Sequence, residues 1–145
     1  MGCSMTEDNS QSSIQKILTK YKTIAVVGCS RDPEKAAYQI PKYMKDQGYK
    51  VIPINPFAET IFGEKTYPSL IDVKEPIDIV DVFRPSNEAV AVVKQAIMKK
   101  AKAVWLQLGI VNEEAAQLAK ENGLDFVMDK CIMVEHKKLP KEKKP

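Results

Sequence analysis

A chain of 145 residues that is 44% hydrophobic can bury one compact core, but it is too short for two domains of ordinary size. Its formal net charge is +3, yet residues 137–145 alone contribute +4, and a nearly neutral body with a basic tail argues against nucleic-acid binding, which needs a clustered cationic surface. No apolar run approaches the roughly 20 residues that cross a bilayer, and no secretory signal is recognised, so we expect a cytoplasmic protein without a membrane segment.

The cysteines give no sign of a disulfide framework or a metal site. Cys3, Cys29 and Cys131 are too few and too scattered for the first, and they lack the C-x-x-C spacing of a zinc site. We therefore expect reduced thiols and no bound metal, as is typical of a cytosolic protein.

The first twelve residues are polar and short of large side chains, so we expect residues 1–12 to be disordered. Residues 1–6 also fit the N-myristoylation pattern, which is common by chance. From residue 13 to residue 21, apolar side chains recur at helical spacing. This spacing predicts a short leading helix packed on a sheet.

The next stretch combines a buried strand with a turn that suits an anion. Residues 24–27 are all apolar, which is typical of a strand covered on both faces. Gly28 permits a tight turn, Ser30 and Asp32 can accept hydrogen bonds from free backbone N–H groups, and Pro33 suits a first helical position. A helix is therefore predicted to begin near Pro33, with its positive end at the carboxyl end of the strand. An ordinary turn that binds nothing is the alternative.

This helix is predicted to end at Gly48, and Pro41 inside it predicts a kink or a lost hydrogen bond unless the helix begins later than Pro33. Residues 58–68 indicate a short irregular excursion, and residues 69–73 indicate one helical turn. Further helices are predicted after the caps Ser86 and Asn112. The remaining strands are predicted at residues 49–54, 77–83, 103–108 and 124–128.

Strands that alternate with helices predict an α/β fold, a Rossmann-like doubly wound parallel sheet of five main strands with helices on both faces. The expected strand order is 3-2-1-4-5, with a ligand crevice where the chain reverses direction between the first and fourth strands. The folded domain is expected to span residues 13–136, followed by a basic disordered tail at residues 137–145.

The turns at the carboxyl ends of these strands would gather on one edge, but they lack the commonest nucleotide signatures. A dinucleotide-binding domain would show G-x-G-x-x-G after the first strand and an acidic residue closing the second. Here the first loop has a single glycine, and the second strand ends in Ile54-Asn55-Pro56. No Walker loop occurs either. Neither paired carboxylates nor a Ser–His arrangement can be assembled at this edge, so we predict no catalytic residue.

Five motifs in the chain, taken together, resemble those of the small stand-alone CoA-binding proteins, which are similar to the CoA-binding domain of the succinyl-CoA synthetase α subunit. The motifs are Val26–Lys35, Val51–Pro56, Asp78–Arg84, Trp105–Gly109 and Met128–Cys131. The resemblance covers roughly residues 20–136, and five motifs in the right order are far more specific than any one of them. It implies coenzyme A as the bound ligand.

The resemblance also implies which residues contact coenzyme A. Its phosphates would meet the first loop and the helix start, its adenosine end the second loop, and its thiol end the loop of Cys131. The implied residues are Gly28, Cys29, Ser30, Arg31, Asp32, Lys35, Asn55, Pro56, Phe57, Phe83, Arg84, Leu106, Gln107, Leu108 and Cys131. The synthetases place a lysine just after the second strand, and its absence here leaves the 3′-phosphate to Lys35 or Arg31.

Our leading interpretation is a module that binds coenzyme A or an acyl-CoA without catalysis of its own. The alternatives are a partner-dependent subunit of an acyl-CoA metabolising enzyme and a binder of another nucleotide such as NAD. The synthetases react through a phosphohistidine on a further domain, and the lone His136 is expected at the surface rather than in that role. A protein partner or a homo-oligomer stays open.

Overall fold

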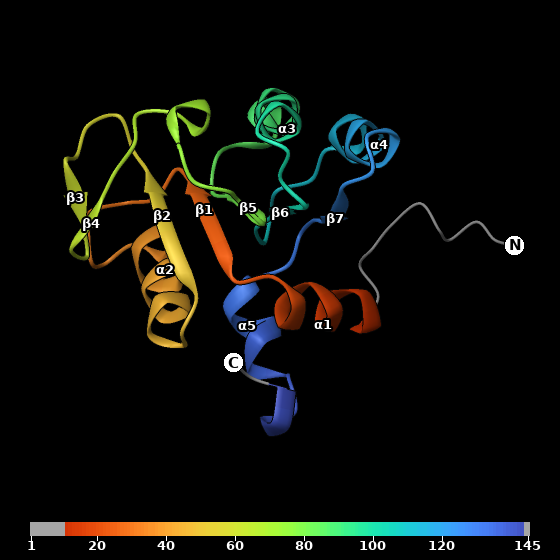
Figure 1. Ribbon diagram of the computed structural model, residues 1–145, viewed down its shortest axis with the longest axis horizontal. Coiled ribbons are helices and arrows are strands. Elements are labelled where there is room, and N and C mark those ends of the chain that lie inside the picture. Colours follow the sequence, from red (N-terminus) through yellow and green to blue (C-terminus); the bar gives the residue numbers. More distant parts are fainter. Residues whose placement is uncertain (1–10, 144–145) are drawn as a thin grey trace, which may run out of the picture.

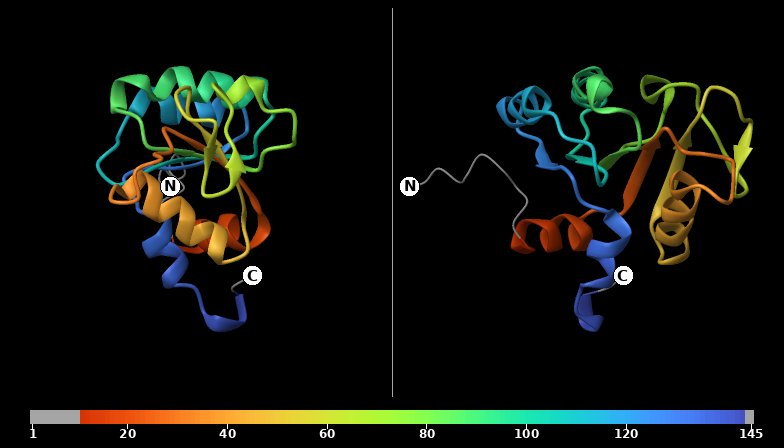
Figure 2. Two further views of the ribbon diagram at one scale, coloured as in Figure 1. Left: turned by 90° about the vertical axis from the view of Figure 1, so that its left-hand side faces the viewer. Right: turned by 180° about the vertical axis from the view of Figure 1, so that it is seen from behind.

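The computed structural model describes residues 11–143, in which a parallel sheet carries helices on both faces (Figures 1 and 2). The helices are α1 (Gln11–Lys20), α2 (Ala36–Asp46), α3 (Ala89–Met98), α4 (Glu113–Glu121) and α5 (Ile132–Lys137). The strands are β1 (Thr23–Val27), β2 (Lys50–Ile54), β3 (Thr60–Ile61), β4 (Glu64–Lys65), β5 (Ile79–Val82), β6 (Ala103–Leu106) and β7 (Asp125–Val127). Single 3₁₀ turns occupy Leu70–Asp72, Ser86–Glu88 and Lys141–Lys143.

The five sheet strands are parallel and follow the order β2-β1-β5-β6-β7. The predicted α/β class, with five main strands and helices on both faces, is confirmed. The order corrects the expected 3-2-1-4-5 at one strand, because β5 pairs with β1 instead of lying outside β2. The connection from β2 to β5 passes across β1, and its Leu70 packs in the same core cluster as Ala25 of β1. The crevice where the chain reverses direction therefore lies between β1 and β5.

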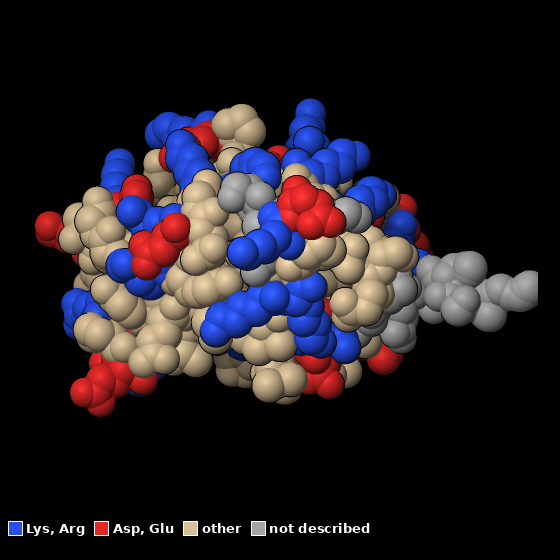
Figure 3. All heavy atoms as spheres, turned by 90° about the horizontal axis from the view of Figure 1, so that it is seen from below, with Lys and Arg blue, Asp and Glu red and all other residues tan. Residues whose placement is uncertain are grey.

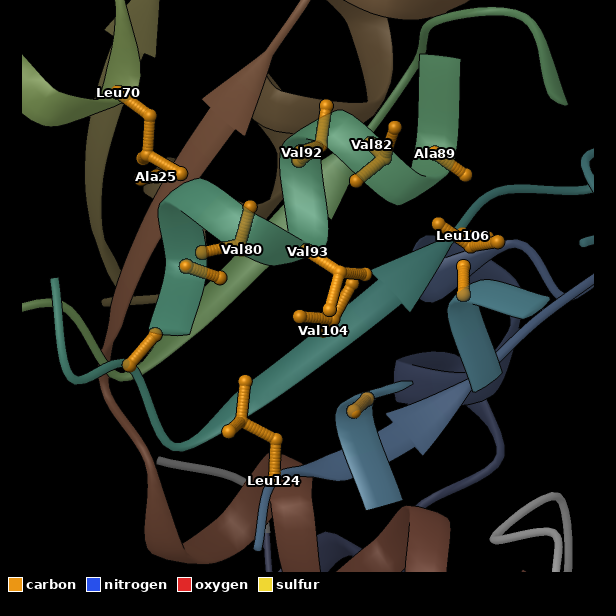
Figure 4. Packing of buried hydrophobic residues seen from close by; sticks show 14 of the residues in the cluster. Ala25, Leu70, Val80, Val82, Ala89, Val92, Val93, Val104, Leu106 and Leu124 are labelled. Atoms are coloured by element: carbon orange, nitrogen blue, oxygen red, sulfur yellow. The ribbon is translucent and has the colours of Figure 1, made fainter. Parts of the chain in front are cut away.

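The two faces of the sheet bury separate cores. Helices α3 and α4 cover one face, and α1, α2 and α5 cover the other (Figure 1). On the first face, Val80 and Val82 of β5 and Val104 and Leu106 of β6 are buried against α3 (Figure 4). Because successive side chains of a strand point to opposite faces, Asp81 and Trp105 lie on the second face.

Helix α2 begins at Ala36, three residues later than the predicted start near Pro33. The preceding residues form turns instead, in which the Lys35 N–H donates to the Asp32 carbonyl at 3.0 Å. Pro41 lies inside the helix and has no N–H to donate to the Ala37 carbonyl. That carbonyl accepts the Ser30 N–H at 3.0 Å instead, so the proline in the helix frees an acceptor that holds the first loop.

The ends of the chain differ from expectation. Residues 1–10 lie outside the described part of the chain, and Gln11 and Ser12, expected to be disordered, already belong to α1. The fold continues past residue 136, where a basic tail was expected, because Leu139 is buried in the core below α1 and α2. The region from 58 to 68, expected to be irregular, contains the β3–β4 hairpin, whereas the predicted helical turn within 69–73 is confirmed.

The prediction that His136 lies at the surface is wrong, because the side chain is 0% exposed. Its Nδ1 atom lies 2.8 Å from the Tyr43 hydroxyl, and its ring makes edge contacts with Tyr43 and Tyr49. The flanking Glu135 and Lys137 gave the segment a polar appearance, but α5 turns His136 inward. It lies between Tyr43 and the buried Tyr49.

Basic side chains are numerous on the face seen from below, with acidic ones between them (Figure 3). Some lysines of the chain lie over tyrosine rings: Lys22 is 5.8 Å from the Tyr49 ring centroid and Lys137 is 5.3 Å from that of Tyr43. Such contacts let the apolar stems cover aromatic rings while the charges stay in water. Within residues 11–143, no helix combines the length and apolar composition of a membrane span.

Candidate functional site

A cleft of about 700 Å³ opens at the carboxyl edge of the sheet, where β1 and β5 separate. Its volume lies in the range typical of small-molecule sites. The first loop after β1, the loop after β2, the loop after β5 and one side of α3 form its walls. The lining residues are Val27, Gly28, Cys29, Ser30, Lys35, Ala37, Ile54, Asn55, Pro56, Phe57, Ser69, Phe83, Arg84, Glu88, Ala91, Val92 and Gln95.

Gly28 is required at the base of this cleft for two reasons. Its φ of +87° lies in the left-handed region, which favours glycine. A Cβ at this position would also lie 2.9 Å from Arg84 Cδ and 3.3 Å from the Phe83 carbonyl carbon. The absence of a side chain therefore lets the first loop pack directly against the loop after β5.

The polar side chains of the first loop shape the loop itself. Ser30 Oγ accepts the Asp32 N–H at 3.0 Å, and Asp32 Oδ1 accepts the Glu34 N–H at 3.0 Å. Neither side chain caps α2, whose N-cap position is held by Lys35 without a side-chain hydrogen bond. The N-terminal turn of α2 thus presents N–H groups and a positive dipole end beside the cleft, a favourable place for an anion.

Asn55 joins the first loop to the second. Its Nδ2 donates to the Cys29 carbonyl at 3.0 Å, while its Oδ1 accepts the N–H groups of Phe57 and Ala58 at 2.7 and 3.1 Å. Arg31 spans the same two loops, because its Nη1 lies 3.4 Å from the Phe57 carbonyl. Asn55 therefore positions the cleft wall as well as lining it. Arg31 is exposed beside the cleft and is not part of its lining.

Arg84 forms a two-point ion pair at the cleft wall. Its Nε and Nη2 donate to Glu88 Oε1 and Oε2 at 3.0 and 2.9 Å. The hydrogen bond from Arg84 lowers the pKa of Glu88, and the bond to Glu88 raises the pKa of Arg84. Lys35 is the other basic residue in the lining.

A second, mostly apolar pocket of about 370 Å³ adjoins the cleft and shares Phe83 with it. Its lining residues are Ala36, Ile40, Phe83, Gln107, Leu108, Ile110 and Cys131. Gln107 is buried, and its Oε1 accepts the Ile132 N–H at 3.1 Å, which fixes the start of α5 behind Cys131. Leu106, predicted to contact the ligand, is buried in the core against α3 and lines neither pocket.

A buried thiol in the cleft lining, that of Cys29, lies near the buried carboxyl group of Asp81. Cys29 is 2% exposed, and burial together with the nearby Asp81 raises the pKa of its thiol to about 12. Asp81, in the central strand β5, is 1% exposed, and neither of its carboxyl oxygens has a hydrogen-bond partner among the described residues. Burial raises the pKa of this carboxyl well above its ordinary value, so its neutral form is favoured.

Residues 22–137 match the protein family described as "CoA binding domain". The chain belongs to this family. It is 42% identical over 130 residues to the uncharacterized protein YneT of Bacillus subtilis (strain 168), a match that covers 90% of this chain and 96% of YneT. It is also 29% identical over 125 residues to an ADP-forming acetate–CoA ligase of Methanocaldococcus jannaschii, which covers 81% of this chain but 18% of the ligase.

A solved structure of a hypothetical protein from Pyrococcus horikoshii OT3 superimposes with a TM-score of 0.87 at 40% identity, over 96% of this chain and 97% of that protein. The predicted resemblance to CoA-binding proteins is thus confirmed. The same domain occurs both as a small protein of this length and as a part of much longer CoA ligases.

The structure brings most of the predicted residues of this CoA-binding domain to one edge. The exceptions are Leu106, which is in the core, and Arg31 and Asp32, which lie in the first loop but outside both linings. One wall of the cleft was not predicted from the sequence: it is supplied by the connection to α3 and by α3 itself, with Glu88, Ala91, Val92 and Gln95. Placing β5 beside β1 would have revealed this wall, because α3 follows β5 directly.

Proposed function

We propose that this chain binds coenzyme A or an acyl-CoA at the edge between β1 and β5 and performs no catalysis of its own. The carrying observation is an uncapped helix N-terminus that faces a cleft with Lys35 and Arg84 in its lining, within a domain of the CoA-binding family. Helix N–H groups and basic side chains are suitable partners for the phosphates of this multiply charged anion.

The two pockets divide the proposed ligand between them. The phosphates meet the Gly28–Pro33 loop and the start of α2. The adenine ring lies near Phe57, whose side chain is 84% exposed and offers an aromatic face for stacking. The thiol arm passes Phe83 into the second pocket, towards Cys131 and the partly exposed Leu108.

Two other functions make different demands. A subunit that works with a catalytic partner is favoured by the kinship to CoA ligases, of which this chain spans about a fifth. Such a subunit would bind coenzyme A at the same edge and gain activity only with the partner. An NAD site would need an acidic residue at the end of β2 to hold the ribose, and this strand ends in Ile54 followed by Asn55.

Calorimetric titration with coenzyme A and with NAD tests the proposal. We expect coenzyme A to bind more tightly, because the loop offers N–H groups to phosphates whereas the ribose-holding carboxylate is missing. Mass spectrometry of small molecules released from the purified protein is an independent measurement. Equal or tighter binding of NAD would overturn the assignment.

Single substitutions test which basic residues contact the phosphate groups of coenzyme A. A charge-assisted hydrogen bond to phosphate is worth about 1.5–3 kcal/mol, so Lys35→Ala should weaken binding of coenzyme A about tenfold or more and leave pantetheine unaffected. Lys42→Ala is the matched control, because Lys42 pairs with Asp46 on α2 and lies outside both pockets. Arg31→Ala should behave like Lys35→Ala. Unchanged binding would show that Arg31 only supports the second loop.

A further inference from the structure

We propose that Glu88 is a resident counter-ion of Arg84, which a phosphate group of the ligand displaces, so that Glu88 sets an upper limit on phosphate affinity. This inference rests on the proposed function, because it describes how the same cleft receives an anion. It assigns a role to a carboxylate that an anion-binding cleft would otherwise be expected to avoid.

The geometry of the pair is that of a bound anion. Both contacts, at 3.0 and 2.9 Å, use one edge of the guanidinium, the arrangement in which arginine also binds a phosphate through two N–H groups. Glu88 and a phosphate at this position would therefore compete for the same donors. With this edge occupied, Arg84 can offer an incoming anion only the N–H groups of its other edge until the carboxylate leaves.

The stem of Arg84 is held in place while its head is exposed. Its Cγ and Cδ atoms lie over Gly28, close to where a Cβ would be, at 3.3 and 2.9 Å. The side chains of Arg84 and Glu88 are 47% and 44% exposed. An exchange of partners therefore needs a rotation of Glu88 into solvent, without a change in the packing of the loop after β5 against the first loop.

The charges of the cleft favour such an exchange. Among the lining residues that the structure describes, Lys35 and Arg84 are basic and Glu88 is the one acid. The Arg84–Glu88 pair cancels its own charge, so the cleft without ligand attracts anions mainly through Lys35 and the start of α2. A multiply charged phosphate ester is a stronger competitor for the guanidinium than a single exposed carboxylate, which gains little from an ion pair in water.

A supporting role for Glu88 makes the opposite prediction. If Glu88 stays bound and orients the guanidinium towards the phosphate, removing its charge weakens ligand binding. If Glu88 acts only by repulsion through space, removing its charge helps whether or not Arg84 is present. The exchange predicts a gain that depends on Arg84, so a double-mutant cycle separates the three cases.

The test is calorimetric titration of the wild type, Glu88→Gln, Arg84→Ala and the double variant with coenzyme A, and in parallel with ADP and inorganic pyrophosphate. We expect Glu88→Gln to bind phosphate ligands about two- to fivefold more tightly, the worth of an exposed ion pair, and Arg84→Ala about tenfold or more weakly. The double variant should match Arg84→Ala. Asp46→Asn, which removes the Lys42 pair of the same i,i+4 spacing on α2, should bind like the wild type.

The outcomes separate this inference from the proposed function. Failure of the wild type to bind coenzyme A overturns the proposed function, while the exchange is then judged with ADP or pyrophosphate and is overturned if neither binds. Equal or weaker binding by Glu88→Gln overturns the exchange even when coenzyme A binds the wild type. So does a gain from Glu88→Gln that persists when Arg84 is already alanine. Melting temperatures of all variants check that each is folded.

Discussion

The two faces of the sheet differ in the kinds of side chain that they bury. The face covered by α3 and α4 holds a mainly aliphatic core, in which β5 and β6 contribute valines and a leucine (Figure 4). Of the five buried polar or charged residues that the structure describes, four belong to the opposite face, under α1, α2 and α5. These are Asp81, Gln107, Glu135 and His136.

The difference shows how the fold positions one segment at the carboxyl edge of the sheet. We call the face under α1, α2 and α5 the polar face, because it holds most of these buried polar residues. On it, Trp105 Nε1 donates to the Lys130 carbonyl at 2.8 Å, and Gln107 accepts the Ile132 N–H. Both bonds fix the segment that carries Cys131 at the second pocket. Both faces bury apolar side chains, which is the main favourable term in folding, and the polar face also buries the large side chain of Trp105. The polar face therefore combines stabilising burial with the hydrogen bonds that position the Cys131 segment.

The largest change in stability is expected at Trp105. Trp105→Ala should lower the free energy of unfolding by about 3–5 kcal/mol, the usual cost of truncating a buried aromatic side chain, and should release the Lys130 carbonyl. Leu106→Ala, on the next residue and the opposite face, should cost about 2–5 kcal/mol. Urea denaturation measures both.

The positioning of the Cys131 segment is tested separately. Reactivity of Cys131 towards a thiol reagent should rise in Trp105→Phe, which loses the N–H, and stay unchanged in Leu106→Ala. Equal reactivity of the two variants would contradict the positioning of this segment by the polar face.

The next effect is a pH dependence of stability that arises from the Asp81 carboxyl group. Because the folded-state pKa is raised above the ordinary value of 3.8, the favourable contribution of the protonated group is full below that value and is lost as the pH rises towards the folded pKa. The stability of the wild type relative to Asp81→Asn should fall by up to about 1.4 kcal/mol per pH unit in that window. Chemical denaturation at several pH values measures this difference. Asp46→Asn, on the exposed side of α2, serves as the control, and a profile of Asp81→Asn parallel to the wild type would contradict the burial argument.

A smaller effect is expected at the aromatic cluster below the sheet. Tyr43→Phe removes the 2.8 Å hydrogen bond to His136 while keeping the ring contact, so it should lower the free energy of unfolding by about 1 kcal/mol. Ligand affinity should not change, because this cluster lies away from the carboxyl edge. Calorimetry and denaturation of the same variant check both statements. A loss of ligand affinity would show that the polar face is coupled to the site beyond the Cys131 segment.

Local patterns in the sequence were sufficient to predict much of the carboxyl edge of the sheet. The apolar run before Gly28 and the Asn55-Pro56 turn each mark a strand end by themselves, and both lie in the cleft lining. The order of the strands was not accessible in this way, because β2 and β5 are similarly apolar and either could occupy the same side of β1. The wall that contains Glu88 depends on that order and was missed with it.

The burial of polar residues could not be predicted from the local sequence pattern either. Asp81 interrupts an apolar strand without a partner to mark it, and His136 stands between charged residues that suggest a solvated helix. Each is buried because of contacts made by distant segments. Leu106 shows the converse, since a motif shared with CoA-binding proteins places the segment at the edge but not the direction of one side chain.

The smallest effect on stability, with the sharpest chemical readout, concerns the two described cysteines. Cys29 is buried, and with a pKa of about 12 it has almost no thiolate near neutral pH, whereas Cys131 is partly exposed in the second pocket. The Cys131 thiolate should attack the S–S bond of CoA disulfide, forming a mixed disulfide and releasing one CoA thiolate.

Intact-mass measurement without reductant tests this in a Cys3→Ser background, because Cys3 lies outside the described residues. One added CoA is expected in that background and with Cys29→Ser, and none with Cys131→Ser. Denaturation curves should differ by less than about 0.5 kcal/mol between the background and Cys131→Ser, since a partly exposed thiol contributes little packing. An adduct that persists in Cys131→Ser would remove this residue from the thiol end of the ligand, whereas its loss together with unchanged stability would tie the loop held by Trp105 and Gln107 directly to the bound thiol.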